Sequence, residues 1–211
     1  MDNAAKIHLS ALETELVNNT EWIFTKQMII EKVYNLLGQL HNRYEEMILS
    51  EKDFLPDELK KPGGKIARGE NYNGLPYLIL DYPATFSKEG VFAIRTMFWW
   101  GNFFSVSLHL SGPHLQSRKN VLSGIDFLRQ HDFFICINEK EWQHDFNSSN
   151  FIPISAIDQN EIESVNEKDF FKIAKRIELV YWEEVPRFLE HTFAQIIHFV
   201  KISYPDGKIV L

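Results

Sequence analysis

The sequence predicts an α+β fold: an antiparallel β-sheet of about five to six strands packed by N-terminal and C-terminal α-helices. Apolar residues recur at helical spacing near both ends of the chain, whereas the middle alternates apolar and polar residues between turns rich in Gly, Pro and Asn. Short links between the alternating runs favour antiparallel neighbours. We therefore expect a single domain over residues 1–211, with a helical part at 1–60, a sheet-rich part at 65–180 and a C-terminal helix at 181–204.

Two helices are expected ahead of the sheet. A short helix over about Asn3–Val17 has apolar residues at every third or fourth position, and a long helix follows from Glu21 to about Ser50, with Asn18 as its capping residue. The long helix has double apolar positions at 22/23, 29/30 and 36/37, a repeat typical of a helix packed on two sides. At about 1.5 Å per residue it spans roughly 43 Å, enough to cross a domain or to reach a partner.

The rest of the chain predicts further strands and a last helix. Runs rich in aromatic and β-branched residues predict strands at Lys65–Glu70, Tyr77–Tyr82, Val91–Trp99 and Phe103–Leu110. After them we expect a helical stretch at Leu115–Gln130, a buried strand at Phe133–Asn138 and a polar excursion at 139–166 with a short strand near Ile152–Ser155. Asp169–Val180 predicts a solvent-facing strand, with a helix as the alternative, and Pro186 lies in the first turn of a helix ending near Tyr204.

The two central strands form a hairpin whose register depends on the length of its loop. With Trp100-Gly101-Asn102 as a three-residue loop, the numbers of facing residues sum to 202, and the large apolar side chains gather on one face. A two-residue loop would mix apolar and polar groups on both faces. Burying a large apolar side chain stabilises the fold by about 1.5–3 kcal/mol, so we predict the three-residue loop.

The opposite face of this hairpin is polar and is the candidate ligand site. In the predicted register Arg95 lies opposite Ser107, and Asp81 joins them if its strand is adjacent. A cation, hydroxyls, an imidazole and a carboxylate beside aromatic walls suit a small anionic or sugar-like ligand. The alternative is a solvated or helix-covered face whose polar groups satisfy one another. The candidate ligand-binding residues are Arg95, Ser105, Ser107, His109, Asp81, Trp99, Tyr72 and Tyr77.

Composition argues against several classes of partner. The 22 Lys and Arg against 29 Asp and Glu give a net charge of −7, so no overall field attracts nucleic acid or anionic lipid. The uncharged stretch 96–117 is interrupted by Gly-Asn and Gly-Pro turns, which disfavours a membrane span. A single cysteine, Cys136, and no secretory signal at the N-terminus are typical of a cytoplasmic protein.

No known catalytic, metal or cofactor motif is present. Ser105 or Ser107 with His109 and Asp81 would be a nucleophile, base and acid, but no G-x-S-x-G turn exposes either serine. The eight histidines lack metal-ligand spacing, and neither a dinucleotide fingerprint nor a P-loop occurs, so we expect no metal and no cofactor. Cys136 lies in an apolar run, which predicts an unreactive core thiol.

These features favour a non-enzymatic binding or protein-interaction module, with a small hydrolase or transferase acting at the polar sheet face as the alternative. Titratable side chains converging beside Arg95 would favour the enzyme, whereas an uncovered apolar stripe on the long helix would favour the interaction protein. We also expect a homodimer, formed through the long helix or the Trp99-Trp100 hairpin tip. The alternative is a monomer in which the N-terminal and C-terminal helices cover both sides of the long helix.

Overall fold

The computed structural model describes residues 8–52, 60, 63–115 and 124–203. Its helices are α1 (Ala11–Asn18), α2 (Thr20–Ser50), α4 (Ile125–Gln130), α5 (Gln159–Glu167) and α6 (Val185–Ser203), with short 3₁₀ turns η3 (Gly112–Leu115), η4 (Ile154–Ala156) and η5 (Leu179–Glu184). Its strands are β1 (Lys65–Tyr72), β2 (Leu75–Phe86), β3 (Val91–Trp99), β4 (Phe103–Ser111), β5 (Phe134–Cys136), β6 (Phe151–Pro153) and β7 (Phe170–Glu178). The α+β class is confirmed.

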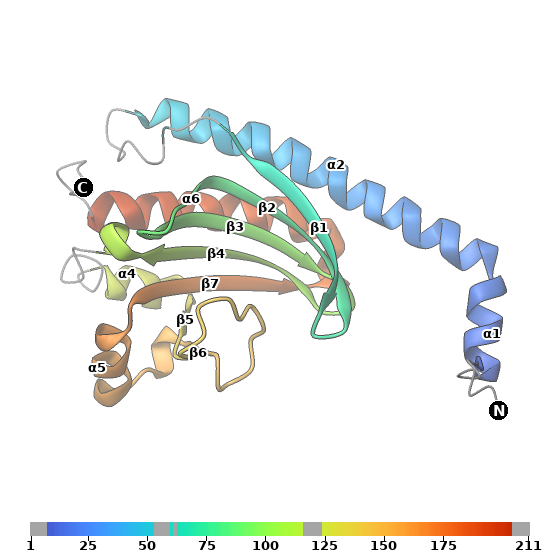
Figure 1. Cartoon of the computed structure of the whole chain (residues 1–211). Helices are drawn as coiled ribbons and strands as arrows, with labels where there is room; N and C mark the ends of the chain where they lie inside the picture. The colour runs from blue at the N-terminus through green and yellow to red at the C-terminus, as the bar shows by residue number, and fades with distance from the viewer. Residues whose placement is uncertain (1–7, 53–59, 61–62, 116–123, 204–211) are drawn as a thin grey trace.

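The strands form one antiparallel sheet in the order β1-β2-β3-β4-β7-β5-β6 (Figure 1). The sheet has seven strands, more than the five to six expected. Its last strand, β6, is short and pairs with β5. The predicted strand near Ile152–Ser155 is therefore Phe151–Pro153, and the 3₁₀ turn η4 takes up the rest. The helix predicted from Leu115 is confirmed only over α4, and residues 116–123 of that prediction lie outside the described residues.

The central hairpin has the predicted register. Phe98 pairs with Phe104, Ile94 with Leu108 and Arg95 with Ser107, as the three-residue loop requires. Gly101 has φ +72°, a left-handed conformation that glycine adopts without steric cost. The loop closes with a hydrogen bond from the backbone N–H of Asn102 to the carbonyl of Trp99 at 3.0 Å.

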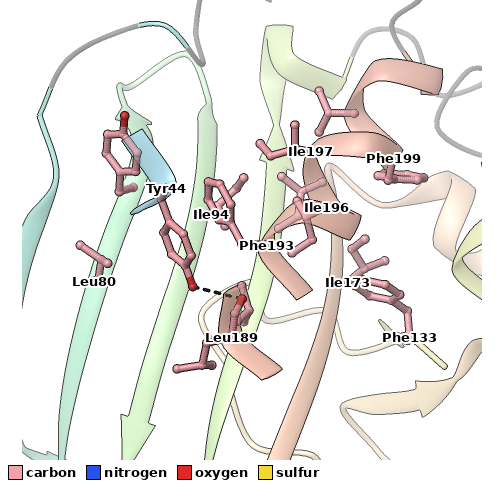
Figure 2. Packing of buried hydrophobic residues seen from close by; sticks show 14 of the residues in the cluster. Tyr44, Leu80, Ile94, Phe133, Ile173, Leu189, Phe193, Ile196, Ile197 and Phe199 are labelled. Carbon is pink, nitrogen blue, oxygen red and sulfur yellow. Dashed lines mark hydrogen bonds between the residues drawn. The ribbon is translucent and has the colours of Figure 1, made fainter. Parts of the chain in front are cut away.

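One face of the sheet packs against α2 and α6, and this interface is the main core (Figures 1 and 2). Tyr44 of α2 stacks on Phe193 of α6 with ring centres 3.7 Å apart. Its hydroxyl donates to the carbonyl of Leu189 at 3.2 Å (Figure 2). The same hydroxyl lies 3.3 Å from the hydroxyl of Thr96 in β3. Tyr44 thus contacts α6 and the sheet at one buried position, and these contacts help to position α2 over the strands.

Helix α1 begins later than predicted, and the capping residue of α2 differs from the predicted one. Helix α1 starts at Ala11, where the Ser10 side chain and Glu13 form a capping box, and residues 1–7 lie outside the described residues. The cap of α2 is Asn19 and not Asn18, since the Asn19 side chain accepts a hydrogen bond from the backbone of Trp22 at 2.9 Å. The long helix and its end at Ser50 are confirmed.

Strand β7 is not the solvent-facing strand that the alternation predicted. It lies between β4 and β5, and its first five residues are all buried. Apolar and polar side chains do alternate along the strand, but the face that carries Lys172 packs against another part of the chain and is not exposed to water. Helix α5 was missed inside the polar excursion, although the Asp158 and Glu161 side chains form a capping box at its start.

The N-terminal end of the chain projects from the body of the protein. Figure 1 shows α1 and the first turns of α2 extending past the edge of the sheet. We call residues 8–28 the arm. None of the α1 residues is buried, and the first buried side chain of α2 is Val33. Among the helices of the described ranges, none is long and apolar enough to cross a membrane.

Candidate functional site

The polar face of the sheet is covered by the connection between β5 and β6. We call this connection, residues 137–150, the strap. It has no regular secondary structure, and it is held to the sheet by side chains of the polar face and of the β1 end. The sequence placed these residues in a polar excursion and did not indicate what they cover.

An ion pair between Arg95 and Asp81 lies at the centre of this face. The pairing of β2 with β3 places the two residues side by side, as predicted. The guanidinium donates two hydrogen bonds to the carboxylate, at 2.7 Å and 2.9 Å, and the two side chains are only 16% and 10% exposed. This bidentate geometry satisfies both groups, so the cation predicted as a ligand contact is already occupied by a carboxylate of the same chain.

His144 of the strap connects this ion pair to a buried lysine of β7. The His144 Nε2 atom lies 3.0 Å from Nη1 of Arg95, and its Nδ1 atom lies 3.3 Å from Nζ of Lys172. Lys172 is 1% exposed and also donates to the carbonyls of Glu141 at 2.9 Å and Gln143 at 2.6 Å. Burial is the main cause that holds the pKa of His144 well below 6.5, and the charges on Lys172 and Arg95 add to it. The imidazole is therefore neutral at physiological pH.

The serines and His109 lie on the same face, as predicted, and all three are buried. The Nε2 atom of His109 is 3.2 Å from a carboxylate oxygen of Glu141, but it lacks hydrogen-bond geometry. Burial lowers the pKa of His109 to about 3, with Lys172 and Arg95 contributing, so this contact is not an ion pair at neutral pH. In the described part of the chain no hydrogen bond links His109 to either serine, and the serine-nucleophile arrangement gains no support.

The three aromatic candidates form a separate cluster at the other end of the face. Tyr72 contacts the rings of Tyr77 and Trp99 edge-on, and these residues pack with Met97 and Phe103. The Trp99 indole donates to the carbonyl of Tyr72 at 3.2 Å. These side chains form a small core rather than an open wall, because Trp99 is only 7% exposed.

Tyr72 also fastens the strap. Its hydroxyl accepts hydrogen bonds from the backbone N–H groups of His144 at 2.6 Å and Asp145 at 3.1 Å. The same hydroxyl donates to the Asp145 carboxylate at 3.3 Å. Burial raises the pKa of Tyr72, which keeps the phenol protonated and able to donate. The aromatic cluster and the polar cluster therefore meet at one strap segment.

Cys136 lies beneath the strap in β5 and is buried, as predicted. Its thiol contacts the side-chain oxygen of Asn150 at 3.4 Å, and burial raises its pKa. The thiolate is therefore disfavoured, which agrees with an unreactive core thiol.

A pocket of about 300 Å³ opens beside the strap, between the hairpin loop and the end of β7. Arg176 is its main charged group. Its guanidinium lies 5.0 Å from the Phe146 ring centre and 5.6 Å from that of Phe103, and its Nε atom is 3.3 Å from the Glu178 carboxylate. The cation that lines this pocket is thus already in contact with two aromatic rings and a carboxylate of the same chain.

The site therefore combines many titratable groups, most of which already contact other groups of the same chain instead of facing a ligand. Lys172 and His144 were not among the predicted site residues. Lys172 belongs to the alternating pattern of its strand and His144 to a polar segment, and only the fold brings them to Arg95. Within the ranges that the structure describes, no group of three or more His, Cys, Asp or Glu side chains is placed to hold a metal ion.

The arm is the second candidate surface. Eight of its large apolar side chains are between 39% and 64% exposed, and Phe24, Leu12 and Val17 are each at least 60% exposed. The hairpin tip, predicted as the other interaction surface, does not expose both indoles, because Trp99 is buried and Trp100 packs edge-on against Phe98. The apolar residues exposed on the arm are Leu9, Leu12, Leu16, Val17, Trp22, Ile23, Phe24 and Met28.

Comparison with known proteins adds no identity to this geometry: no family model, no curated protein and no solved structure matches the chain.

Proposed function

We propose that this chain is a non-enzymatic interaction protein that pairs with a second copy of itself through the arm. The observation that carries the proposal is the exposure of eight large apolar side chains on a projecting helical segment. Soluble proteins rarely expose apolar patches of more than a few hundred Å² unless the patch binds something. Large side chains have areas of about 150–250 Å², so at these exposures the arm presents on the order of 800 Å². About 800 Å² per partner is the size of a standard stable interface.

The stability of α1 also supports a partner. This helix has eight residues, none of them buried. Isolated helices shorter than about 12–15 residues are marginal in water, because the helix nucleus is costly and most helical stability comes from packing. A capping box favours the start of α1 but buries no apolar side chain. Contact with another molecule would supply the missing packing.

The charge pattern of α2 favours a second copy as that partner. Glu21, Phe24, Met28 and Lys32 are spaced by three, four and four residues, so they lie on one face, and all four are exposed. Antiparallel pairing of two such faces about a two-fold axis places Phe24 against Met28 and Glu21 against Lys32 of the other copy. Parallel pairing would place like charges together. The face is therefore complementary to itself in one orientation.

Sedimentation equilibrium tests the proposal. We expect a mass near twice 24.8 kDa at micromolar concentrations, and a monomer mass for Phe24→Glu. Gln39→Glu is the matched control, since it adds the same charge to an exposed position of α2 outside the arm. Lys32→Glu is expected to weaken the dimer by placing two glutamates together, and Glu21→Lys with Lys32→Glu is expected to restore it. A wild-type monomer at 100 µM, a concentration that favours even weak dimers with Kd of about 10 µM, would contradict the proposal.

A small hydrolase or transferase is the second candidate, favoured by the convergence of titratable groups beside Arg95. The ion pair with Asp81 and the covering strap count against it, because the cation is occupied and the serines are buried. Hydrolysis of a small ester or phosphoester that Ser107→Ala abolishes, while the fold is retained, would favour the enzyme over the interaction protein.

A further inference from the structure

Lys172 is a buried amine with three polar neighbours at hydrogen-bonding distance. Two of them, the carbonyls of Glu141 and Gln143, can only accept. The third is Nδ1 of His144, which can either donate or accept depending on where the imidazole carries its proton. The other ring nitrogen, Nε2, faces Nη1 of Arg95 at 3.0 Å. The proton positions on Lys172, His144 and Arg95 are therefore not independent.

Arginine fixes the assignment, because its guanidinium is always charged and only donates. Nε2 of His144 must then accept, so the neutral ring carries its proton on Nδ1 and donates toward Lys172. A neutral lysine amine has two N–H donors and one lone pair. These match the two carbonyls and the Nδ1 proton, and every group is satisfied.

A protonated Lys172 cannot satisfy the same contacts. An ammonium has three donors and no acceptor, so its third N–H requires Nδ1 of His144 to accept. The imidazole proton then moves to Nε2, where it faces the N–H of Arg95 at 3.0 Å. Two donors are left opposed in a buried site, next to two cationic side chains. The closed position of the strap is thus compatible with a neutral Lys172 and disfavoured by a charged one.

The charges around the amine come from every element packed against it. Arg95 of β3 disfavours the ammonium, whereas the carboxylates of Glu141 and Asp145 in the strap favour it, as the Cys136 group of β5 would if it were ionised. Burial is the main cause that lowers the Lys172 pKa from 10.5 to about 8. Lys172 therefore changes charge close to physiological pH, while neighbouring His144 stays neutral. Asp81 remains paired with Arg95, and His109 of β4 is the other titratable group on this face.

We propose that the strap is a proton-sensitive cover over the polar sheet face, closed when Lys172 is a neutral amine and loosened when that amine takes up a proton. The strap carries both carbonyls and the imidazole that Lys172 binds, so one proton acts on three of its contacts with the sheet. When the strap lifts, the Arg95–Asp81 pair and the buried hydroxyls beside it become accessible. Binding of a small ligand at this face would then depend on pH.

The size of the effect follows from linkage. The Lys172 amine has a pKa of about 8 when the strap is closed and 10.5 when the strap is released, so it binds a proton more tightly in the open state. The open state therefore becomes more populated as pH falls from 10.5 to 8. The effect levels off below pH 8, where the amine is protonated in both states. Between pH 9 and pH 7 the opening equilibrium is expected to rise roughly tenfold.

Hydrogen exchange of the strap tests this directly. The backbone N–H groups of His144 and Asp145 are bonded to Tyr72 in the closed state, so their protection reports opening. After correction for the intrinsic rate, we expect about tenfold lower protection at pH 7 than at pH 9. Lys172→Met removes the titrating group and is expected to abolish the difference. Lys168→Met is the matched control, because Lys168 also donates to strap carbonyls, at 2.5 Å and 2.9 Å, and the difference is expected to persist.

Equal protection at both pH values in the wild type, or a difference that persists in Lys172→Met, would overturn the proposal. If Lys172→Met does not fold, titration of the Lys172 side chain by NMR in the wild-type protein decides the question. A midpoint near 8 supports the proposal, and an amine still fully protonated at pH 9 overturns it.

Discussion

Removing the Asp81 carboxylate is expected to destabilise the protein strongly, because it leaves a buried guanidinium without its counter-charge. In the wild type Arg95 donates two hydrogen bonds to Asp81, and its further contacts are with neutral groups, the His144 ring and the face of Trp142. Breaking a buried ion pair by deleting one partner typically costs about 3–5 kcal/mol. The two side chains are 10% and 16% exposed, so water screens the pair slightly, and we expect the lower end of that range for Asp81→Ala.

The expected loss is large against the total stability of a domain, which is about 5–15 kcal/mol. For a chain of this size, about 3 kcal/mol corresponds to a fall in Tm of roughly 6–12 °C. Urea denaturation gives the free energy of unfolding, and scanning calorimetry gives Tm. Glu190→Ala is the matched control, because the Arg43–Glu190 pair has an exposed arginine, at 58%, and should be worth at most about 1 kcal/mol.

A double variant separates the cost of an unpaired charge from the value of the pair itself. Asp81→Leu with Arg95→Met replaces both ions by apolar side chains of similar volume, and we expect stability within about 1 kcal/mol of the wild type. If Asp81→Ala costs no more than Glu190→Ala, the ion pair is not buried in solution and the reasoning about the covered face is refuted.

Two further predictions concern groups beneath the strap. Cys136 is 2% exposed and its pKa is raised by burial. We therefore expect a thiol reagent to label the native protein only through opening events, over minutes or longer. Complete labelling within seconds under native conditions would contradict this expectation. Burial lowers the pKa of His109 to about 3, so we expect its ring to stay neutral from pH 5 to pH 8. The ring resonances, followed by NMR, should not report protonation of the imidazole over that interval. A titration midpoint near 6.5 would show that the ring is open to water.

Much of the fold could be predicted from local patterns. The spacing of apolar residues located α2 to within a residue at each end, and Pro186 lies in the first turn of the last helix as predicted. That helix begins at Val185 and not at 181, because residues 181–184 belong to the 3₁₀ turn η5. The hairpin register followed from one parity argument, since a shift of one residue would exchange the two faces of both strands. Asp81 was expected on the polar face only if its strand were adjacent, and the pairing of β2 with β3 places it opposite Arg95.

The candidate site was predicted only in part. The polar face and most of its hairpin residues were found, because their side chains alternate with the core side chains of the same strands. The strap was not, since its irregular backbone has no periodic signal and its position depends on side chains elsewhere in the chain. The aromatic candidates Tyr72, Tyr77 and Trp99 were expected to line a pocket, and the fold instead packs them together.

Local sequence patterns therefore establish which faces are apolar, where the long helices lie and how the central hairpin pairs, since each of these depends on residues close together in the chain. That the polar face is covered and the arm is not depends instead on contacts between distant parts of the chain. Arg95 and His144 are 49 residues apart and His144 and Lys172 are 28 apart, and no local period connects them. The charge state of Lys172 depends on its burial and on neighbours from three separate segments. No single stretch of the sequence could therefore have predicted it.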